Sequence, residues 1–413
     1  MSSDLQAGLE SRKTAIQAAG KDIFAKCYDF NVAEGLKANR LYPYFTPFEV
    51  NEGPVARLDG QEVVMLGSNN YLGLTTDPRV REAVVKAVHE YGPSMTGSRL
   101  LNGTTKYHME VEEEFADFLG AEACLIFTTG YQANLGVVSA LVNVGSVAVV
   151  DKADHASVHD GARMADGELR IFPHGKIDKL DRILGLIPEE KGAMVIVDGI
   201  FSMEGDIVDL PAVSAVCKKH GARLLVDDAH ALGVIGKGGR GTASHFGMED
   251  DVDLIVGTFS KSMASVGGWA VGPKEVLDWV RHFGRSMLFS ASLPPTNLAA
   301  AHTALKILRE EPERVDRLNE NASYMREQLR SIGYNTMDST TPVIPLLIGD
   351  DFKTIQYWRA LLDAGVYVNP VMYPAVEEGH GLVRTSYMAT HERSHLDRAL
   401  EILEKVGKQF GII

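Results

Sequence analysis

The sequence predicts an α/β protein that has a large domain built on a mostly parallel sheet and a smaller C-terminal α/β domain. Two observations support this fold class. From about residue 60 to 290, short aliphatic or β-branched runs alternate with longer helix-like stretches, and the runs are apolar on both faces, as a doubly covered parallel sheet requires. After Pro294-Pro295 the pattern becomes helix-rich and then ends in short strand-like runs and a last helix. We therefore expect an N-terminal arm over 1–55, a large domain over 56–295 and a small domain over 296–413.

The composition excludes several classes of protein. Among the 413 residues, 41 are basic and 55 acidic, which leaves a net charge of −14, and a field of that sign disfavours binding to nucleic acid. No apolar run approaches the roughly 20 residues of a membrane span, and the polar start lacks the apolar core of a signal peptide. The three cysteines are too few and too widely spaced for a disulfide framework or a CxxC metal site. We expect a cytoplasmic enzyme without an integral membrane segment. Membrane attachment through the segment before Asn51 is expected to be weak at most, because its mixed charges form no basic amphipathic face.

The elements can be placed in order along the chain. Residues 1 to about 45 are helix-compatible, and the aromatic cluster that ends them, 41–45, is expected to pack on the body or on a partner subunit. Strands of the large sheet are predicted at 123–127, 146–150, 194–197, 223–226, 253–256 and 269–271. Helices should fill 295–335 and 352–362, with strands at 343–348, 366–368 and 382–384. The last helix should begin after Thr390 as N-cap and carry an apolar stripe of Leu396, Leu400, Leu403 and Phe410.

Polar residues follow five of the predicted strands directly. They are 129–131, 154–157, Asp198 with Ser202, 227–230, and Thr258 with Lys261. Ligands bind outside the carboxyl ends of the strands in open α/β sheets, so these residues are expected to meet in one crevice.

The residue types in that crevice suit one cofactor. Lys261 alone would most simply be a surface lysine, but in an apolar crevice its pKa would fall and its amine could form a Schiff base. Asp227, at the end of an apolar run, needs a cation, and a protonated pyridine nitrogen is one. His155 offers a flat ring for stacking, and Gly130 and Tyr131 begin a helix whose free N–H groups favour a phosphate. Together these features predict pyridoxal 5′-phosphate (PLP).

Two other patterns fit known motifs in letters only. His391 and His395 form an HExxH sequence, but His391 is expected to turn towards solvent and no third ligand is evident, so zinc is not predicted. The glycine-rich segment 236–241 opens no helix, and we interpret it as a turn over the mouth of the site rather than a dinucleotide fingerprint. No P-loop sequence is present.

The chain resembles the α-oxoamine synthases of PLP fold type I over nearly its whole length. The resemblance rests on NNYLG (69–73), GSR (97–99), FTTGYQAN (127–134), DHAS (154–157), FSMEGD (201–206), VDDAH (226–230) and TFSKS (258–262).

The resemblance implies a role for each matching residue. Lys261 would bind PLP covalently, Asp227 would pair with the pyridine nitrogen, and His155 would stack on the ring. His230 and Ser202 would contact the phenolic oxygen. Phosphate contacts would come from Gly130, Tyr131 and Thr258 and, across a homodimer with shared active sites, from Ser290 and Ala291 of the neighbouring subunit. Asn70 and Arg384 would hold the substrate carboxylate.

The family joins a small amino acid to an acyl-CoA with loss of CoA and carbon dioxide. Segments 97–103, 257–262 and 290–295 are most similar to bacterial serine palmitoyltransferases, which implies L-serine and palmitoyl-CoA as substrates and 3-ketodihydrosphingosine as product. Segments 41–45 and 69–73 also resemble members that use glycine or alanine, and YGPSMT (91–96) departs from the usual glycine-serine-glycine pattern. The alternatives are 8-amino-7-oxononanoate synthase and glycine C-acetyltransferase, then an aminotransferase or β-eliminating lyase, and a non-catalytic partner subunit of the same fold.

Overall fold

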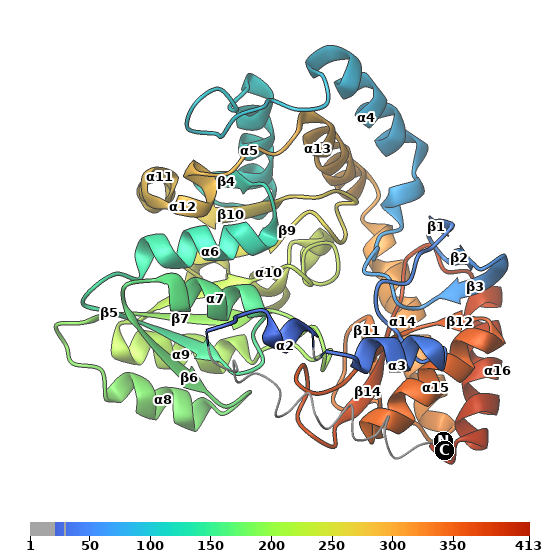
Figure 1. Ribbon diagram of the computed structural model, residues 1–413. Coiled ribbons are helices and arrows are strands. Elements are labelled where there is room, and N and C mark those ends of the chain that lie inside the picture. The colour runs from blue at the N-terminus through green and yellow to red at the C-terminus, as the bar shows by residue number, and fades with distance from the viewer. Residues whose placement is uncertain (1–20, 29) are drawn as a thin grey trace.

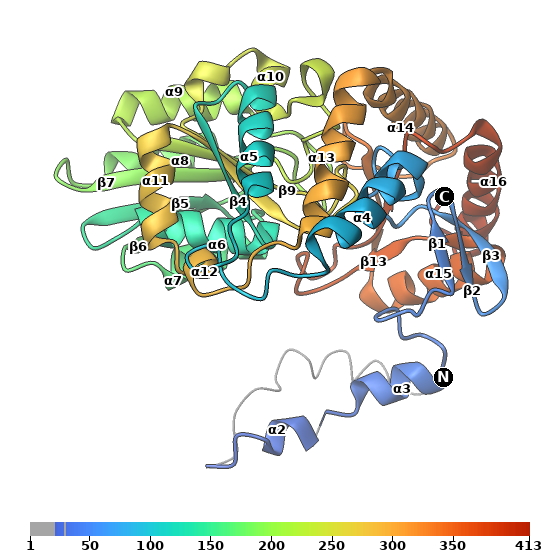
Figure 2. The same ribbon diagram turned by 90° about the horizontal axis from the view of Figure 1, so that it is seen from above.

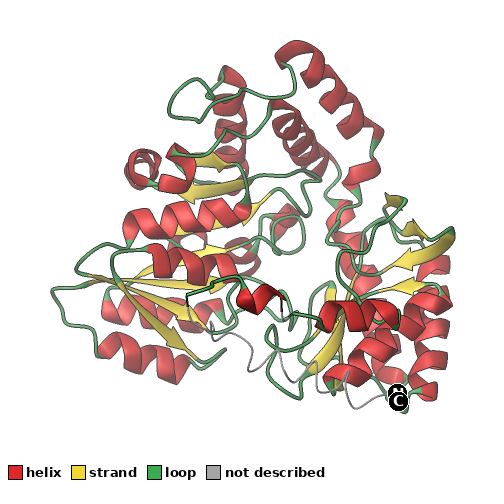
Figure 3. Cartoon of the chain, viewed as in Figure 1, coloured by secondary structure: helices red, strands yellow, loops and turns green. Residues whose placement is uncertain are grey.

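The large domain is a three-layer α/β structure (Figures 1 and 3). The computed structural model describes residues 21–28 and 30–413, so residues 1–20 of the predicted arm lie outside the described residues. The central sheet has seven strands in the order β4-β10-β9-β8-β7-β5-β6, and β10 is antiparallel to both of its neighbours. The strands span Ala123–Phe127 (β4), Ser146–Asp151 (β5), Glu168–Phe172 (β6), Gly192–Asp198 (β7), Arg223–Asp227 (β8), Leu254–Thr258 (β9) and Gly268–Gly272 (β10).

Alternation along each strand sends apolar side chains into two separate cores. In β4, Leu125 and Phe127 pack with α6, α7, α11 and α12, whereas Cys124 and Ile126 pack with α5 and α13 on the opposite face. Helices α8 and α9 extend that second face under β5, β7 and β8. The helices of the large domain span Pro78–Tyr91 (α4), Lys106–Leu119 (α5), Gly130–Leu141 (α6), Ala156–Met164 (α7), Ile177–Gly185 (α8), Leu210–His220 (α9), Thr242–Phe246 (α10), Lys274–Phe283 (α11), Arg285–Leu288 (α12) and Pro295–Glu310 (α13).

All six predicted strands of this sheet are present, and one strand was missed. β6 lies at the edge of the sheet, where four of its five residues are half-buried or exposed and Phe172 alone is buried. The sequence ELRIF therefore lacks the continuous apolar run by which the inner strands are recognised.

The smaller domain combines C-terminal elements with strands from near the N-terminus. A three-stranded sheet, β11-β14-β13, lies beside helices α14 to α16. A second sheet has the order β1-β2-β3-β12, so the segment 50–65 pairs with a C-terminal strand. These elements span Val50–Glu52 (β1), Val55–Leu58 (β2), Gln61–Met65 (β3), Glu313–Ser331 (α14), Val343–Gly349 (β11), Asp351–Ala364 (α15), Val366–Tyr367 (β12), Asn369–Val371 (β13), Gly381–Ser386 (β14) and Arg393–Gln409 (α16).

The large domain was predicted to begin at residue 56, and the pairing of β3 with β12 differs from that boundary. Val63 and Val64 of β3 are fully buried in one core with α14, α15 and α16. Residues 56–65 therefore pack with the C-terminal elements rather than with the large sheet, because their apolar partners lie some 300 residues further along the chain.

The last helix begins two residues later than predicted. Its N-cap is Glu392 rather than Thr390, and the Glu392 N–H donates to Nδ1 of His395, 3.1 Å away. The predicted stripe faces the core, with Leu396 and Leu403 fully buried and Leu400 and Phe410 partly so.

The described part of the arm contacts the body at its C-terminal end. Leu36 of α3 (Val32–Ala38) and Leu41 are buried against Ile355 and Met372. In contrast, α2 (Ala25–Tyr28) lies apart from the body in Figure 2 and has no buried side chain. Over residues 21–28 and 30–413, no helix is long and apolar enough to cross a bilayer.

Candidate active site

Two adjoining cavities open at the carboxyl edge of the large sheet. The first, about 270 Å³, is lined by residues that follow β4, β5, β7, β8 and β9, as the sequence predicts. The second, about 530 Å³, lies between residues 68–75 and 260–266 and the start of α13. Ser260, Lys261 and Val266 line both, so Lys261 stands at their junction.

The predicted site residues divide into three groups. Seven line the first cavity: Gly130, Tyr131, His155, Asp227, His230, Thr258 and Lys261. Asn70 and Lys261 line the second. Ser202, Ser290, Ala291 and Arg384 line neither, although each contacts a residue or segment next to them.

Lys261 lies three residues beyond β9, in a loop closed by hydrogen bonds. The Ser265 N–H donates to the Phe259 carbonyl and the Phe259 N–H donates to that of Gly267, which holds the loop against the strand. Burial lowers the pKa of Lys261 to about 8, although the nearby carboxyl groups of Asp227 and Asp198 oppose the shift. A substantial fraction of the amine is therefore neutral near pH 8, and a neutral amine is the form that reacts with an aldehyde.

Asp227, the last residue of β8, is buried with two hydrogen bonds. Its Oδ2 accepts from Nδ2 of Asn134 at 2.6 Å, and its Oδ1 accepts from the Ala229 N–H at 2.9 Å. Only 4% of Asp227 is exposed, and none of the ion pairs among the described residues includes it. Within the described residues the carboxylate thus has no direct ion-pair partner, although the amine of Lys261 is nearby, and burial of its charge favours a bound cation.

His155 is the N-cap of α7, and three groups hold it in place. Its backbone N–H donates to the Asp198 carboxyl group at 3.2 Å. Its Nδ1 lies 2.7 Å from the Ser157 hydroxyl and accepts from the Ser157 N–H at 3.3 Å. Burial lowers the pKa of His155, which favours the neutral ring.

The start of α6 forms a cradle of free N–H groups. Thr129 caps the helix by accepting from the Gln132 N–H, which leaves the N–H groups of Gly130 and Tyr131 outside the helical ladder. A Cβ on Gly130 would lie 2.7 Å from Cβ of Thr258, so the end of β9 needs glycine there. Thr258 in turn donates to the Gly267 carbonyl at 2.9 Å. The positive end of the helix and two small neighbours suit a phosphate.

A buried network connects the cavity to β14. Nδ1 of His230 lies 2.7 Å from the Tyr71 hydroxyl, which also accepts from Nη2 of Arg384 at 3.5 Å. Arg384 donates through Nε to the Ser202 carbonyl and through Nη2 to Oδ1 of Asn69 at 3.0 Å. Among the described residues no carboxylate pairs with this buried guanidinium. Asn69, which accepts from Arg384, lines the second cavity, so the guanidinium lies next to that cavity.

The other predicted residues lie at the rim. Asn70 donates to Thr75 Oγ1 at 2.8 Å, and its buried Oδ1 has no hydrogen-bond partner. Ser290 accepts from Nε2 of Gln132 at 3.0 Å, and the Ala291 carbonyl accepts from the Thr128 hydroxyl, so both lie next to the start of α6.

Sequence reasoning gave no role to three contributors, Asn134, Ser157 and Tyr71, although it placed Ser157 in the crevice. Each lay inside a quoted motif, but an amide, a serine and a tyrosine in such motifs have no residue-level signature of function. Only the fold shows that Asn134 of α6 reaches Asp227, which lies 93 positions away in the sequence.

Two expectations about neighbouring segments were wrong. The segment 236–241 lines neither cavity, since Gly239 packs near Leu308 and Val315 and Gly241 approaches the Asp228 carboxyl group. The segment also leads into a helix, because Gly241 is the N-cap of α10. His391 is buried rather than turned towards solvent, because its ring accepts from the Met388 N–H at 2.9 Å and lies 3.1 Å from the Met65 carbonyl. Both of its nitrogens are thus occupied by the backbone, and the residue precedes α16 instead of lying on it.

Comparisons with known proteins agree with this site. The family model for aminotransferase class I and II matches residues 61–403. A serine palmitoyltransferase of Sphingobacterium spiritivorum is 44% identical over 93% of this chain and 96% of its own length. An 8-amino-7-oxononanoate synthase of Thermoanaerobacter pseudethanolicus is 40% identical over 92% and 96%, respectively. A solved structure of SPT with PLP superposes with a TM-score of 0.91 at 36% identity and covers 95% of this chain and 100% of the other.

The chain therefore belongs to the aminotransferase class I and II family and has the PLP-dependent transferase fold type I. Its cofactor is PLP. Within that fold the protein is an α-oxoamine synthase, a PLP-dependent acyltransferase, which confirms the family resemblance of the sequence.

The residues of the first cavity fit the cofactor. A reactive aldehyde, a ring cation and a phosphate call for an amine, an anion and free N–H groups, and Lys261, Asp227 and the start of α6 present these around one cavity. Gly130 also lets the start of α6 lie close to Thr258, since any side chain at position 130 would clash with that residue.

Proposed function

We propose that the protein is a serine palmitoyltransferase, which condenses L-serine with palmitoyl-CoA to give 3-ketodihydrosphingosine, CoA and carbon dioxide, the first step of sphingolipid synthesis. The observation that carries the proposal is the likeness to SPT with PLP, with a TM-score of 0.91 over 95% of this chain. The 44% identity to the Sphingobacterium enzyme supports the same assignment.

In this proposal, eight residues bind and orient the cofactor. Lys261 holds it covalently, Asp227 faces the pyridine nitrogen, and His155 covers the ring. His230 and Ser202 face the phenolic oxygen, while the N–H groups of Gly130 and Tyr131, with Thr258, bind the phosphate. When bound, PLP supplies an electron sink for the bonds at the α-carbon of the amino acid.

The chain's own groups bind the substrate and move the proton. Arg384, a buried guanidinium without a carboxylate partner among the described residues, binds the carboxylate of serine with Asn70 nearby. Nζ of Lys261 takes the α-proton, and its lowered pKa suits a base at neutral pH. The α-carbon then bonds to the thioester carbonyl carbon as the C–S bond breaks, and the CoA thiolate takes a proton from solvent to leave as the thiol. When the carboxylate leaves as carbon dioxide, the protonated Nζ of Lys261 returns a proton to the α-carbon in its place.

The proposal includes a homodimer with shared active sites in the cytoplasm. Leu100, Leu101 and Phe289 expose 56%, 79% and 72% of their surface beside the site. They lie on two loops that are joined by the bridge between Ser98 and Ala291. Apolar side chains gathered in this way mark an interface, and Ser290 and Ala291 would there reach the phosphate of the neighbouring subunit.

The test is a product assay on the purified holoenzyme. Serine with palmitoyl-CoA should yield 3-ketodihydrosphingosine and CoA in equal amounts, and Lys261→Ala should lose product formation and borohydride labelling together. Lys218→Ala, a change at a surface ion pair with Asp251, serves as control. Absence of the ketone with the parent protein would overturn the assignment.

The 40% identity to an 8-amino-7-oxononanoate synthase favours a second candidate, which uses alanine and a pimeloyl thioester. Competition among serine, alanine and glycine, followed by the spectral change of the cofactor on binding each, separates this candidate and glycine C-acetyltransferase from the first. Transfer of the amino group to a keto acid without CoA release would indicate an aminotransferase. A colourless protein would indicate a non-catalytic subunit.

A further inference from the structure

We propose that Asn134 and Ser157 are positioning residues that connect Asp227 to His155 by a hydrogen-bond relay and hold the His155 ring as its Nε2–H tautomer. The inference rests on the proposed function in one respect: it is there that Asp227 and His155, the two ends of the relay, are assigned to face the cofactor. The relay itself rests on the geometry of four residues from α6, α7, β8 and the loop after β5.

The four side chains form an unbroken chain of short contacts. Nδ2 of Asn134 lies 2.6 Å from Oδ2 of Asp227 and 2.9 Å from Oγ of Ser157. Oγ of Ser157 lies 2.7 Å from Nδ1 of His155. Three of the four members are closed to solvent, with 2% of Asn134, 1% of Ser157 and 4% of Asp227 exposed. Helices α6 and α7, which carry the two central residues, run side by side in Figure 1.

The direction of each hydrogen bond follows from the chemistry of its partners. An ionised carboxylate only accepts, so the group of Asn134 that faces Asp227 must be the NH₂, and its second hydrogen is free for Ser157. The Ser157 hydroxyl then accepts one hydrogen and has its own to donate, and its neighbour is Nδ1 of His155. The opposite amide orientation would place the Asn134 carbonyl oxygen against the carboxylate.

A second, longer contact favours the same tautomer. The backbone N–H of Ser157 can only donate, and it points at Nδ1 of His155 from 3.3 Å. Two donors on one ring nitrogen require that nitrogen to carry a lone pair, so the proton of the neutral ring lies on Nε2. The lowered pKa of His155 agrees with a neutral ring.

The relay has a consequence for the site. His155 is anchored through its backbone by Asp198, but the rotation of its ring depends on Ser157. With Nδ1 satisfied, the Nε2–H is the one donor that the ring can offer to a ligand. Because Asn134 bonds to both Asp227 and Ser157, loss of the amide leaves Oδ2 of Asp227 unpaired and releases Ser157 at the same time.

The first experiment measures the unaltered protein and uses one variant only to identify the signals. In holoenzyme with ¹⁵N-labelled histidine, the His155 signals, identified by their loss in His155→Asn, should show an unprotonated Nδ1 and a protonated Nε2 at pH 7.5. A protonated Nδ1 would overturn the proposal whether or not any product is formed, because this measurement does not depend on the condensation reaction.

The second experiment removes one link. Ser157→Ala keeps only the longer 3.3 Å backbone contact to Nδ1, so a fraction of the Nδ1–H tautomer should appear and KM for the amino acid should rise at least tenfold with PLP still bound. Ser157→Thr keeps the hydroxyl and should retain the Nε2–H form. Ser214→Ala, a buried serine of α9 far from the cavity, is the matched control. An unchanged tautomer and KM in Ser157→Ala would reject the relay but leave the proposed function intact. Lack of ketone product in the parent would reject the function but leave the tautomer result standing.

Discussion

His174 lies between two carboxylates at the end of β6. Its Nδ1 is 3.1 Å from Oδ1 of Asp151, and its Nε2 is 3.2 Å from Oδ2 of Asp206. Carboxylates on both ring nitrogens require two ring protons, and these contacts raise the pKa of His174 to about 10. The charged ring thereby joins β5 to the 201–206 loop, whose Ser202 carbonyl accepts from Arg384.

We predict that this ring stabilises the protein most at neutral and lower pH. A folded-state pKa above the unfolded value means that the folded state binds the proton more tightly, so the stabilisation is complete below about pH 6.5 and disappears as pH rises towards 10. His174→Gln should lower the free energy of unfolding at pH 6, and the difference from the parent should shrink at pH 8 and more at pH 10. Urea titrations at the three pH values measure this, and a difference independent of pH would contradict it.

The absence of a side chain at Gly130 lets the start of α6 lie against the end of β9. Gly130→Ala would force the new Cβ to 2.7 Å from Thr258, which should cost about 1–3 kcal/mol of stability and weaken PLP binding at least tenfold. Equilibrium titration of apoenzyme with PLP and thermal unfolding measure both effects. Gly185→Ala, at the end of α8 with its nearest contact at 3.4 Å, should leave PLP affinity unchanged.

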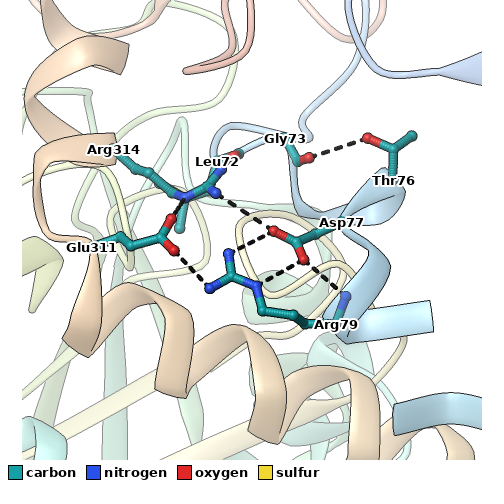
Figure 4. A network of polar contacts seen from close by, with 7 residues as sticks. All are labelled: Leu72, Gly73, Thr76, Asp77, Arg79, Glu311 and Arg314. Carbon is teal, nitrogen blue, oxygen red and sulfur yellow. Dashed lines mark hydrogen bonds and ion pairs between the residues drawn. The ribbon is translucent and has the colours of Figure 1, made fainter. Parts of the chain in front are cut away.

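At the scale of elements, the N-terminus of α4 is joined to the α13–α14 turn by a network of charges (Figure 4). Asp77 caps α4 by accepting from the Arg79 N–H, and the Arg79 guanidinium donates to Asp77 at 2.8 Å and to Glu311 at 2.6 Å. Arg314 completes the network with Glu311 at 2.6 Å and with the Leu72 carbonyl at 3.4 Å. The network thereby holds the segment that follows Asn70 and Tyr71 against the junction of the two domains.

Asp77→Ala should destabilise the protein by about 2 kcal/mol, because the change removes a helix cap worth about 1 kcal/mol and two partly buried ion pairs. Asp209→Ala is the matched control, since Asp209 caps α9 in the same way, also near a proline, without an ion pair among the described residues. We expect about 1 kcal/mol for the control. The excess at Asp77 should fall in 1 M NaCl, and an equal loss for both variants at low salt would show that the ion pairs contribute nothing.

At the scale of the whole molecule, the site needs both domains. Lys261, Asp227 and His155 come from the large sheet, whereas Arg384 comes from β14 of the smaller domain. Tyr71 connects them, because its hydroxyl contacts both His230 and Arg384. The proposed binding of substrate at Arg384 would thus be sensitive to how the two domains are packed.

The proposed homodimer gives a prediction at this scale. The parent should sediment at about twice the chain mass of 45.0 kDa. Phe289→Glu places a charge on the exposed apolar loops and should shift the protein towards the monomer with at least a tenfold loss of activity. Val144→Glu, in the turn before β5 at the opposite edge of the sheet and 82% exposed in the parent, should change neither property. A dimeric and fully active Phe289→Glu protein would place the interface elsewhere.

The sequence by itself determined the inner strands of the large sheet and the polar residues that follow them. Both are local signals: an apolar run covered on two faces, and a lysine, aspartate, histidine or glycine directly after it. Seven of the predicted residues consequently line the first cavity. Tertiary structure alone decided that 50–65 pairs with β12, that His391 is buried, and that Asn134 and Tyr71 belong to the site. These facts depend on contacts between residues that are far apart in the chain, such as Asn69 and Arg384, 315 positions apart, and no local pattern of residues records such a contact.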